Sequence, residues 1–249
     1  MNTLTLDIGN SKVKSVFWND SEPFIHLVSP DLSRDELYDD IRKYGVNEVI
    51  FSTVRGNGNK VAEWLSGFPF ENIMELTALE ARDFTEKSSY DSHIGSDRIA
   101  AYYGAEVLYP STSKLVIDLG TAITMDVIDK EGKFCGGDIV LGLKGRLNAL
   151  NYSTATLPLV KKDDAIMPAP FGTNTKSAIY NGAINGIVGE ILYAAKRAKK
   201  YFDIEKIIMT GGDAGIILPL VKEEGLECEN DQFLVARGLN HYLRRNKIS

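Results

Sequence analysis

Leu4-Thr5-Leu6-Asp7-Ile8-Gly9-Asn10-Ser11, near the start of the chain, has a counterpart in its middle, Leu115-Val116-Ile117-Asp118-Leu119-Gly120-Thr121-Ala122. In both stretches an apolar run with β-branched members is followed by an aspartate and, two positions later, a glycine. In each copy a small side chain with a hydroxyl or amide group comes next, Asn10 in the first and Thr121 in the second. The pattern is typical of a strand that turns back on itself. One Asp-x-Gly turn is common in hairpins, whereas two copies half a chain apart indicate duplicated halves.

Turns of this kind can also bind ligands. Their backbone N–H groups and small polar side chains can hold phosphate oxygens, and the aspartate can hold a cation close by. The duplication therefore predicts two loops that face each other across one nucleotide site.

Composition bounds the class of protein. The chain has 249 residues, 44% hydrophobic and 25% charged, which is ordinary for a globular protein. A net charge of −6 and a pI near 5.2 argue against a nucleic-acid-binding surface, which needs a basic face. Cys135 and Cys228 show neither metal-ligand spacing nor a disulfide framework. We expect a cytoplasmic protein, without a signal peptide and without a membrane span of about 20 apolar residues.

The two halves show the same order of expected elements. In the first half we expect strands at 2–7, 12–18, 24–28 and 48–52 and helices at 31–44, 59–66 and 95–108. Asp31 is the expected cap of the first helix and Gly45 its expected terminator. In the second half we expect strands at 114–118, 122–128, 133–137 and 207–209, helices at 142–151 and 174–199, and closing segments at 219–224 and 236–245.

This order predicts an α/β protein with two ribonuclease-H-like domains that have mixed sheets. The expected domains are residues 1–112 and 113–249, with the nucleotide in the cleft between them. The stripe of Ile184, Ile187, Val188, Ile191 and Leu192 has helical spacing. It is either a core stripe or part of a subunit interface, and we favour the core.

The block Gly95-Ser96-Asp97-Arg98 is the third informative stretch. Taken alone, it fits a helix cap with a surface ion pair. In a functional interpretation, Asp97 accepts a proton from a substrate hydroxyl and Arg98 faces an anionic substrate or the transferring phosphoryl group. Tyr90, Ser92 and His93 are close enough in sequence to line the same pocket, although a lone tyrosine or histidine is more often a packing residue.

Two glycine-rich stretches complete the set. Gly136-Gly137-Asp138-Ile139, with Gly142 and Gly145 behind it, is expected to form a turn that leads into a helix. It matches neither a Walker A loop nor a Rossmann fingerprint. Thr210-Gly211-Gly212-Asp213 follows a buried strand, and its glycine pair would let the backbone approach an adenine ring or ribose.

Taken in order, these blocks resemble the type III pantothenate kinases, within the superfamily of acetate and sugar kinases, Hsp70 and actin. The resemblance covers nearly the whole chain. The blocks that carry it are Asp7-Ile8-Gly9-Asn10-Ser11, Tyr90 with Gly95-Ser96-Asp97-Arg98, Asp118-Leu119-Gly120-Thr121-Ala122-Ile123-Thr124, Gly136-Gly137, Thr154-Ala155-Thr156-Leu157-Pro158, Gly172-Thr173-Asn174-Thr175 and Gly211-Gly212-Asp213.

The resemblance implies ATP-dependent phosphorylation of pantothenate, the first step of coenzyme A synthesis, by a homodimer whose partner subunit helps to enclose pantothenate. It implies a phosphate loop formed by Asp7, Ile8, Gly9, Asn10, Ser11, Lys12, Val13 and Lys14, with Asp7 near Mg²⁺. It implies that Thr121 contacts ATP and that Asp118 binds a monovalent cation, K⁺ or NH₄⁺. Asp97 would be the general base, and Tyr90, Gly95, Ser96, Asp97, Arg98 and Thr175 would contact pantothenate.

The chain departs from the family pattern in three places. Ser11 replaces a commoner threonine, Leu141 stands before Gly142 where proline is usual, and Arg55 occupies a position that is usually small or proline. The sequence does not reveal what Arg55 does. Two other functions stay open: a kinase of the same fold for a sugar or a short-chain acid, and a non-catalytic nucleotide-binding regulator.

Overall fold

The computed structural model describes residues 2–90, 94–162, 164 and 168–246. The chain divides into two compact units. Unit 1 contains the chain up to Ser111, Gly132–Cys135 and the chain from Phe233 onward, and unit 2 contains Thr112–Glu131 and Gly136–Gln232. The chain thus passes from unit 1 to unit 2 next to the expected boundary at residues 112 and 113, and the domain limits themselves stay a prediction.

Unit 1 is built on a mixed five-stranded sheet with the order β3-β2-β1-β4-β5. Its strands are β1 (Asn2–Ile8), β2 (Val13–Asn19), β3 (Glu22–Ser29), β4 (Glu48–Thr53) and β5 (Asn72–Glu75). β2 is antiparallel to both β1 and β3, while β4 runs parallel to β1 and to β5. The first four strands and their order are as predicted, and β5 was not predicted.

Both faces of β1 are buried. Leu4, Leu6 and Ile8 join the core under α1 (Arg34–Lys43) and α2 (Gly58–Leu65). On the opposite face, Thr3 donates a hydrogen bond to Asn240 of α8 (Leu234–Arg245), with 2.8 Å between Oγ1 and Oδ1. On that face Trp18 Nε1 also donates to Thr5 Oγ1 over 2.9 Å. Side chains alternate along a strand, so Asp7 lies on the same face as these two threonines.

The cap of α1 differs from the expectation. Ser33 is the N-cap, because its hydroxyl accepts the N–H of Glu36, whereas Asp31 lies two residues earlier and pairs with Arg55. The predicted terminator is confirmed, since Gly45 follows the C-cap with a φ of +59°.

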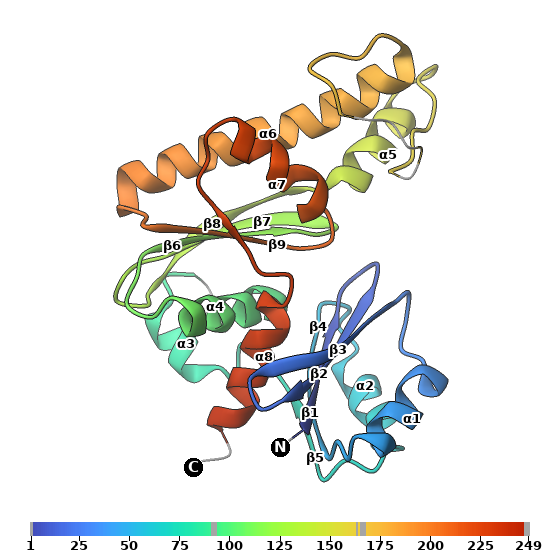
Figure 1. Ribbon diagram of the computed structural model, residues 1–249, viewed down its shortest axis with the longest axis vertical. Coiled ribbons are helices and arrows are strands. Elements are labelled where there is room, and N and C mark those ends of the chain that lie inside the picture. The colour runs from blue at the N-terminus through green and yellow to red at the C-terminus, as the bar shows by residue number, and fades with distance from the viewer. Residues whose placement is uncertain (1, 91–93, 163, 165–167, 247–249) are drawn as a thin grey trace. The chain divides into compact units, whose positions relative to one another are not determined.

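The other helices of unit 1 cover the second face of its sheet. α4 (Ser96–Leu108) lies beside α8, which also packs on β1 (Figure 1). The short α3 (Arg82–Lys87), which was not predicted, is tied to both helices through Asp83. Tyr103 of α4 donates to one carboxylate oxygen of Asp83 over 2.7 Å, and Arg245 of α8 lies 2.8 Å from the other.

Unit 2 repeats the topology of unit 1. Its sheet has the order β10-β9-β6-β7-β8, so β6 takes the place of β1. The strands are β6 (Lys114–Leu119), β7 (Ala122–Ile128), β8 (Phe134–Leu141), β9 (Lys206–Thr210) and β10 (Glu229–Asn230). β6 is antiparallel to β7 and parallel to β9. The predicted duplication of strand order is therefore confirmed.

The expectation of a turn at Gly136–Ile139 is wrong, because these residues lie inside β8. A Cβ atom at Gly137 would collide with the backbone and carboxylate of Asp126, so this glycine allows close packing against β7. The turn comes later, at Gly142, which caps the next helix.

Three helices complete unit 2: α5 (Leu143–Ser153), α6 (Thr175–Phe202) and α7 (Ala214–Glu223). Ile184, Ile187, Val188 and Ile191 of α6 are buried in the unit, which confirms the core interpretation of that stripe. α7 begins five residues before the expected segment and contains Pro219. None of the described helices combines the length and the apolar character needed to cross a membrane.

The contact of Tyr103 with Asp83 predicts a pH-dependent stability. Burial alone would raise the pKa of Asp83, but hydrogen bonds from Tyr103 and Arg245 outweigh it and hold that pKa below its usual value. Because the folded pKa is lowered, this stabilisation is complete above the unfolded pKa of about 3.9 and is lost as the pH falls through the folded value. Tyr103→Phe should lower the free energy of unfolding by about 1 kcal/mol at pH 7, and by less below pH 4 or so.

Tyr102→Phe is the matched control for urea unfolding at both pH values. Tyr102 is equally buried on α4, but it donates to a neutral acceptor, the carbonyl of Gly132, over 2.8 Å. Its loss of stability should not change with pH. A pH-independent loss in Tyr103→Phe would contradict the assignment.

Candidate functional site

The turn between β1 and β2 is closed and presents polar groups to solvent. The N–H of Gly9 donates to the carbonyl of Lys12 over 3.0 Å. Asn10, Ser11 and Lys12 at the tip are exposed. At the base, Asp7 is 8% exposed, and its carboxylate lies 3.4 Å from Lys14 Nζ. The predicted phosphate loop is therefore a rigid turn with a buried acidic residue and a cation beneath it.

The loop after β4 supports this turn. The N–H of Val54 donates to the carbonyl of Ile8 over 3.3 Å. Arg55 Nε donates to the carbonyl of Gly9 over 2.9 Å. Arg55 is thus a site residue to which sequence reasoning assigned no role. The available signal was an arginine that directly follows a buried strand parallel to β1.

The same loop contacts the Gly95–Arg98 block. Gly95 is the N-cap of α4, and Ser96 Oγ donates to the carbonyl of Thr53 over 3.2 Å. Asp97 accepts the N–H of Arg98 with 2.8 Å between N and Oδ1. The segment from Thr53 to Arg55 therefore contacts both the Gly9 turn and the Gly95–Arg98 block within unit 1.

Arg98 and Tyr90 also meet, as the sequence predicted. Arg98 is only 5% exposed, and its guanidinium carbon lies 4.8 Å from the centre of the Tyr90 ring and 5.5 Å from that of Phe134. This burial excludes the alternative in which Arg98 forms a surface ion pair. A guanidinium between aromatic rings keeps its charge and has a fixed direction. Ser92 and His93 lie outside the described residues.

Unit 2 holds the second loop, between β6 and β7. Asp118, the last residue but one of β6, is half-buried, and Thr121 is exposed. The N–H of Gly120 donates to the carbonyl of Ala122 over 3.2 Å, and the N–H of Asp213 donates to the carbonyl of Leu119 over 3.0 Å. The second glycine pair therefore lies beside this loop, as its place after β9 predicts.

Glycines make this close approach possible. A Cβ atom at Gly211, whose φ is +98°, would lie 2.5 Å from both Asp118 Oδ1 and Leu119 N. Gly142, whose N–H donates to the carbonyl of Thr121 over 3.0 Å, packs equally closely against the carbonyl of Gly120. The unusual Leu141 removes none of these contacts, because the essential residue there is Gly142.

Lys162 and Thr175 are two further polar residues of unit 2. Lys162 forms an ion pair with Asp213 and lies 3.4 Å from the carbonyl of Gly212, so a cation stands beside the glycine pair. Thr175 is exposed at the first position of α6, where Asn174 and Ser177 form a capping box. Among the described residues, hydrogen bonds and close packing bring the glycine pair to the loop of Asp118 and Thr121, and they do not bring Thr175 there.

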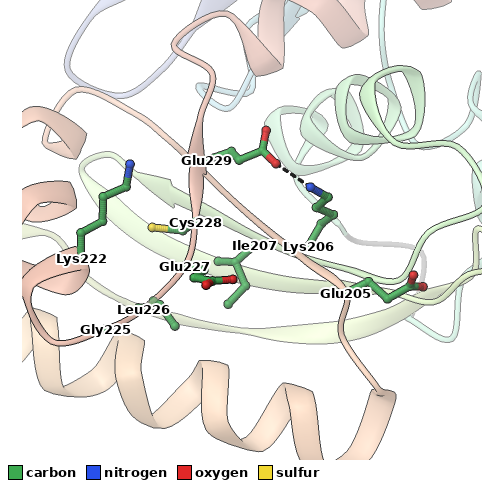
Figure 2. A pocket seen from close by; sticks show the side chains of 9 residues that line it. All are labelled: Glu205, Lys206, Ile207, Lys222, Gly225, Leu226, Glu227, Cys228 and Glu229. Carbon is green, nitrogen blue, oxygen red and sulfur yellow. Dashed lines mark hydrogen bonds and ion pairs between the residues drawn. The ribbon is translucent and has the colours of Figure 1, made fainter.

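A pocket of about 520 Å³ lies elsewhere in unit 2. Figure 2 shows its mixed charges, among them the ion pair between Lys206 and Glu229, with 2.7 Å between Nζ and Oε1. Lys206 begins β9, whereas Thr210 ends that strand next to Asp118. The pocket is therefore at the opposite end of the sheet from the loop.

The acidic side chains of the predicted site suit cations that need only a few ligands from the protein. Within the described residues, no three Asp, Glu, His or Cys side chains cluster as a metal site. Mg²⁺ bound with a nucleotide needs only one or two carboxylates, since phosphates and water complete its shell. Asp7 is suitably placed for that, and the carboxylate and carbonyl oxygens around Asp118 suit a hard monovalent cation.

The second loop can be tested through its two neighbouring glycines. Gly211→Ala should lower the free energy of unfolding by about 1–3 kcal/mol, because it adds a methyl group at a positive φ against Asp118 and Leu119. Gly212→Ala should stay within about 0.5 kcal/mol, since nothing lies within 4 Å of its Cβ position. Urea unfolding compares the two, and equal effects would contradict the packing.

Comparison with known families identifies close relatives. The model of the family described as type III pantothenate kinase matches residues 3–197. A type III pantothenate kinase of Phocaeicola vulgatus is 32% identical over 243 residues, which is 98% of either chain. Another from Porphyromonas gingivalis is 40% identical over 155 residues, 61% of this chain and 62% of the relative.

Solved structures show the fold. A protein from Campylobacter jejuni described as a Baf family transcriptional activator has a TM-score of 0.64 and 20% identity, covering 99% of this chain and 100% of its own. A protein from Listeria monocytogenes described as an N-acetylmannosamine kinase has a TM-score of 0.56 and 11% identity, with coverages of 99% and 100%. An archaeal actin homolog has a TM-score of 0.55 and 12% identity, with coverages of 98% and 100%. These similarities confirm the actin-like, ribonuclease-H-like fold class.

Proposed function

The chain belongs to the type III pantothenate kinase family, and from that premise we propose which residues carry its reaction. The enzyme transfers a phosphoryl group from ATP to pantothenate, giving 4′-phosphopantothenate, the first step of coenzyme A biosynthesis. One observation carries the assignment of roles: the short segment from Thr53 to Arg55 contacts both the Gly9 turn and Ser96. A donor loop and an acceptor block are thereby held together in one unit.

Residues Asp7 to Lys14 are the proposed phosphate loop. Its exposed tip and closed backbone support this role, because N–H groups that are not used inside a turn can donate to phosphate oxygens. Lys14, whose Nζ lies 3.4 Å from the Asp7 carboxylate, offsets that negative charge beneath the phosphates. In unit 2, we assign Thr121 to ATP and Asp118 to a monovalent cation, K⁺ or NH₄⁺.

Asp97 is the proposed general base. Its carboxylate would accept the proton of the primary hydroxyl of pantothenate as that oxygen forms its bond to the γ-phosphorus and the bond to ADP breaks. The N–H of Arg98 holds the carboxylate, and Arg98 itself would attract the anionic pantothenate. Mg²⁺, which we place near Asp7, neutralises charge on the phosphates when it is bound. Tyr90, Gly95, Ser96 and Thr175 are the other proposed pantothenate contacts.

We further propose that the enzyme is a homodimer that works in the cytoplasm. β8 is an edge strand, and its Ile139 and Leu141, on the same face, are 56% and 55% exposed. Phe171, beside the start of α6, is 87% exposed. An exposed apolar sheet edge tends to pair with another chain, so a second copy is the proposed cover. The cytoplasm supplies ATP and suits the free thiols of Cys135 and Cys228.

An assay of pantothenate-dependent ADP release tests the chemistry. Asp97→Asn should lower kcat by a factor of about 10²–10⁴, because the general base is lost, while the Kd of an ATP analogue changes little. Asp39→Asn, on the exposed face of α1, is the matched control and should keep full activity. Replacing K⁺ with Na⁺ should lower the rate of the wild type.

Other outcomes would change the assignment. Undiminished turnover in Asp97→Asn would remove this residue as the base. ATP binding without pantothenate-dependent ADP release would instead favour a different acceptor or a regulatory role.

Size-exclusion chromatography with light scattering tests the dimer. The double change Ile139→Lys and Leu141→Lys should yield monomers, because it places two charges on the proposed interface. Leu79→Lys replaces an 84% exposed leucine of unit 1 and should leave the dimer intact. A wild type that runs as a monomer, or a double variant that stays dimeric, would contradict this interface.

A further inference from the structure

Arg55 contacts three oxygens in two loops. Its Nε donates to the carbonyl of Gly9 over 2.9 Å, in the turn between β1 and β2. Its Nη1 lies 2.9 Å from Asp31 Oδ1, and its Nη2 lies 3.4 Å from the carbonyl of Pro30, both in the loop after β3. The ends of β1, β3 and β4 share one edge of the sheet, so a side chain from the β4 loop can reach both other loops.

The hydrogen bond from Arg55 to the carbonyl of Gly9 also fixes the direction of the N–H group in the same peptide. The carbonyl of Gly9 and the N–H of Asn10 belong to one planar peptide group, and in a trans peptide they point in opposite directions. A guanidinium that holds the carbonyl therefore keeps the N–H of Asn10 directed away from Arg55. No cis peptide bond occurs in the described chain, so this geometry applies here.

We infer that Arg55 is a positioning residue of the phosphate loop, which directs the N–H of Asn10 toward the phosphates of ATP. The inference rests on the proposed assignment of this loop to ATP. Arg55 touches the loop backbone and acts on ATP through it. It thus gives a role to a residue that the sequence alone left unexplained.

An arginine suits this role better than another cation. Its planar guanidinium can donate along several fixed directions, whereas the single ammonium of lysine is a point charge on a flexible stem. Asp31 holds the guanidinium from the other side and is itself held by the N–H of Leu32. That hydrogen bond first, and then the one from Arg55, keep the pKa of Asp31 below its usual value, so the pair stays charged at neutral pH.

The hydrogen bond between Ser96 of the Gly95–Arg98 block and Thr53 is separate from the contacts of Arg55. Ser96 binds the carbonyl of Thr53, and the Arg55 side chain takes no part in that contact. Loss of the guanidinium should therefore weaken ATP binding and leave pantothenate binding nearly unchanged. A general loss of structure would weaken the binding of ATP and of pantothenate alike.

The test compares Arg55→Gln with Arg34→Gln. Arg34 is a matched control, because it too donates to a backbone carbonyl of unit 1, that of Gly67 over 2.7 Å, but away from the loop. Arg55→Gln should raise the KM for ATP about tenfold, the effect of one charged hydrogen bond, and leave the KM for pantothenate within about twofold. Arg55→Lys should restore part of the ATP affinity. Equal KM values for ATP in the two glutamine variants would overturn the inference.

A second variant covers the case in which Arg55→Gln does not fold. The side chain of Asp31 is 76% exposed, so Asp31→Asn should fold normally. It releases the guanidinium on one side and should raise the KM for ATP by about two- to fivefold, in the range of an exposed ion pair. An unchanged KM for ATP in Asp31→Asn would contradict the inference that Asp31 holds Arg55 in place for ATP binding.

Amide hydrogen exchange in the wild type separates failure of the inference from failure of the proposed loop. A bound, non-hydrolysable ATP analogue should slow exchange at residues 9–12. If it does not, the assignment of this loop to phosphate is wrong, whatever the Arg55 variants do. If it does, and Arg55→Gln retains full ATP affinity, only the role of Arg55 is wrong.

Discussion

A turn that binds an anion through its backbone must leave N–H groups unused and still hold its shape. In a helix or a sheet those same groups would provide the rigidity. The turn between β1 and β2 is held by an internal hydrogen bond from Gly9 to Lys12 and by supports from outside, from Val54 and Arg55. The rest of unit 1 places those supports, since the parallel pairing of β1 with β4 brings the two loops to one edge.

The duplicated halves solve this problem in different ways. In unit 1, a long charged side chain reaches the loop backbone and holds it. In unit 2, Gly142 and Gly211 bring other segments of backbone directly against the loop from Asp118 to Thr121. The strand order is therefore the shared property of the two halves, and the means of stiffening each loop is free to differ. The two halves thus share a topology, while different residues stiffen their loops.

Local pattern sufficed to predict most of the strands, because alternating and β-branched runs such as Leu4 to Ile8 specify them without distant partners. It failed where a distant contact decided the outcome. Asp31 pairs with Arg55, 24 residues away, so Ser33 caps α1 instead. Gly136 and Gly137 resembled a turn because the close packing of Gly137 on β7 is invisible in the sequence. Likewise, the contact between Tyr90 and Arg98 was predictable from their proximity in sequence. The contacts of Arg55 with Gly9 and Asp31 were not, because they depend on the order of the strands in the folded sheet.

The return of the chain to unit 1 through α8 affects how the protein is made. The hydrogen bond between Thr3 and Asn240 joins residues 237 positions apart, and α8 covers the face of β1 that carries Thr3, Thr5 and Asp7. A ribosome adds about 5–20 residues per second, so the first strand waits many seconds for its cover. During that time unit 1 keeps one face of its sheet without the helix α8 that covers it. The half that is synthesised first is thus the half that is completed last, and a nascent chain that is released before α8 is made would leave the face of β1 that carries Asp7 uncovered.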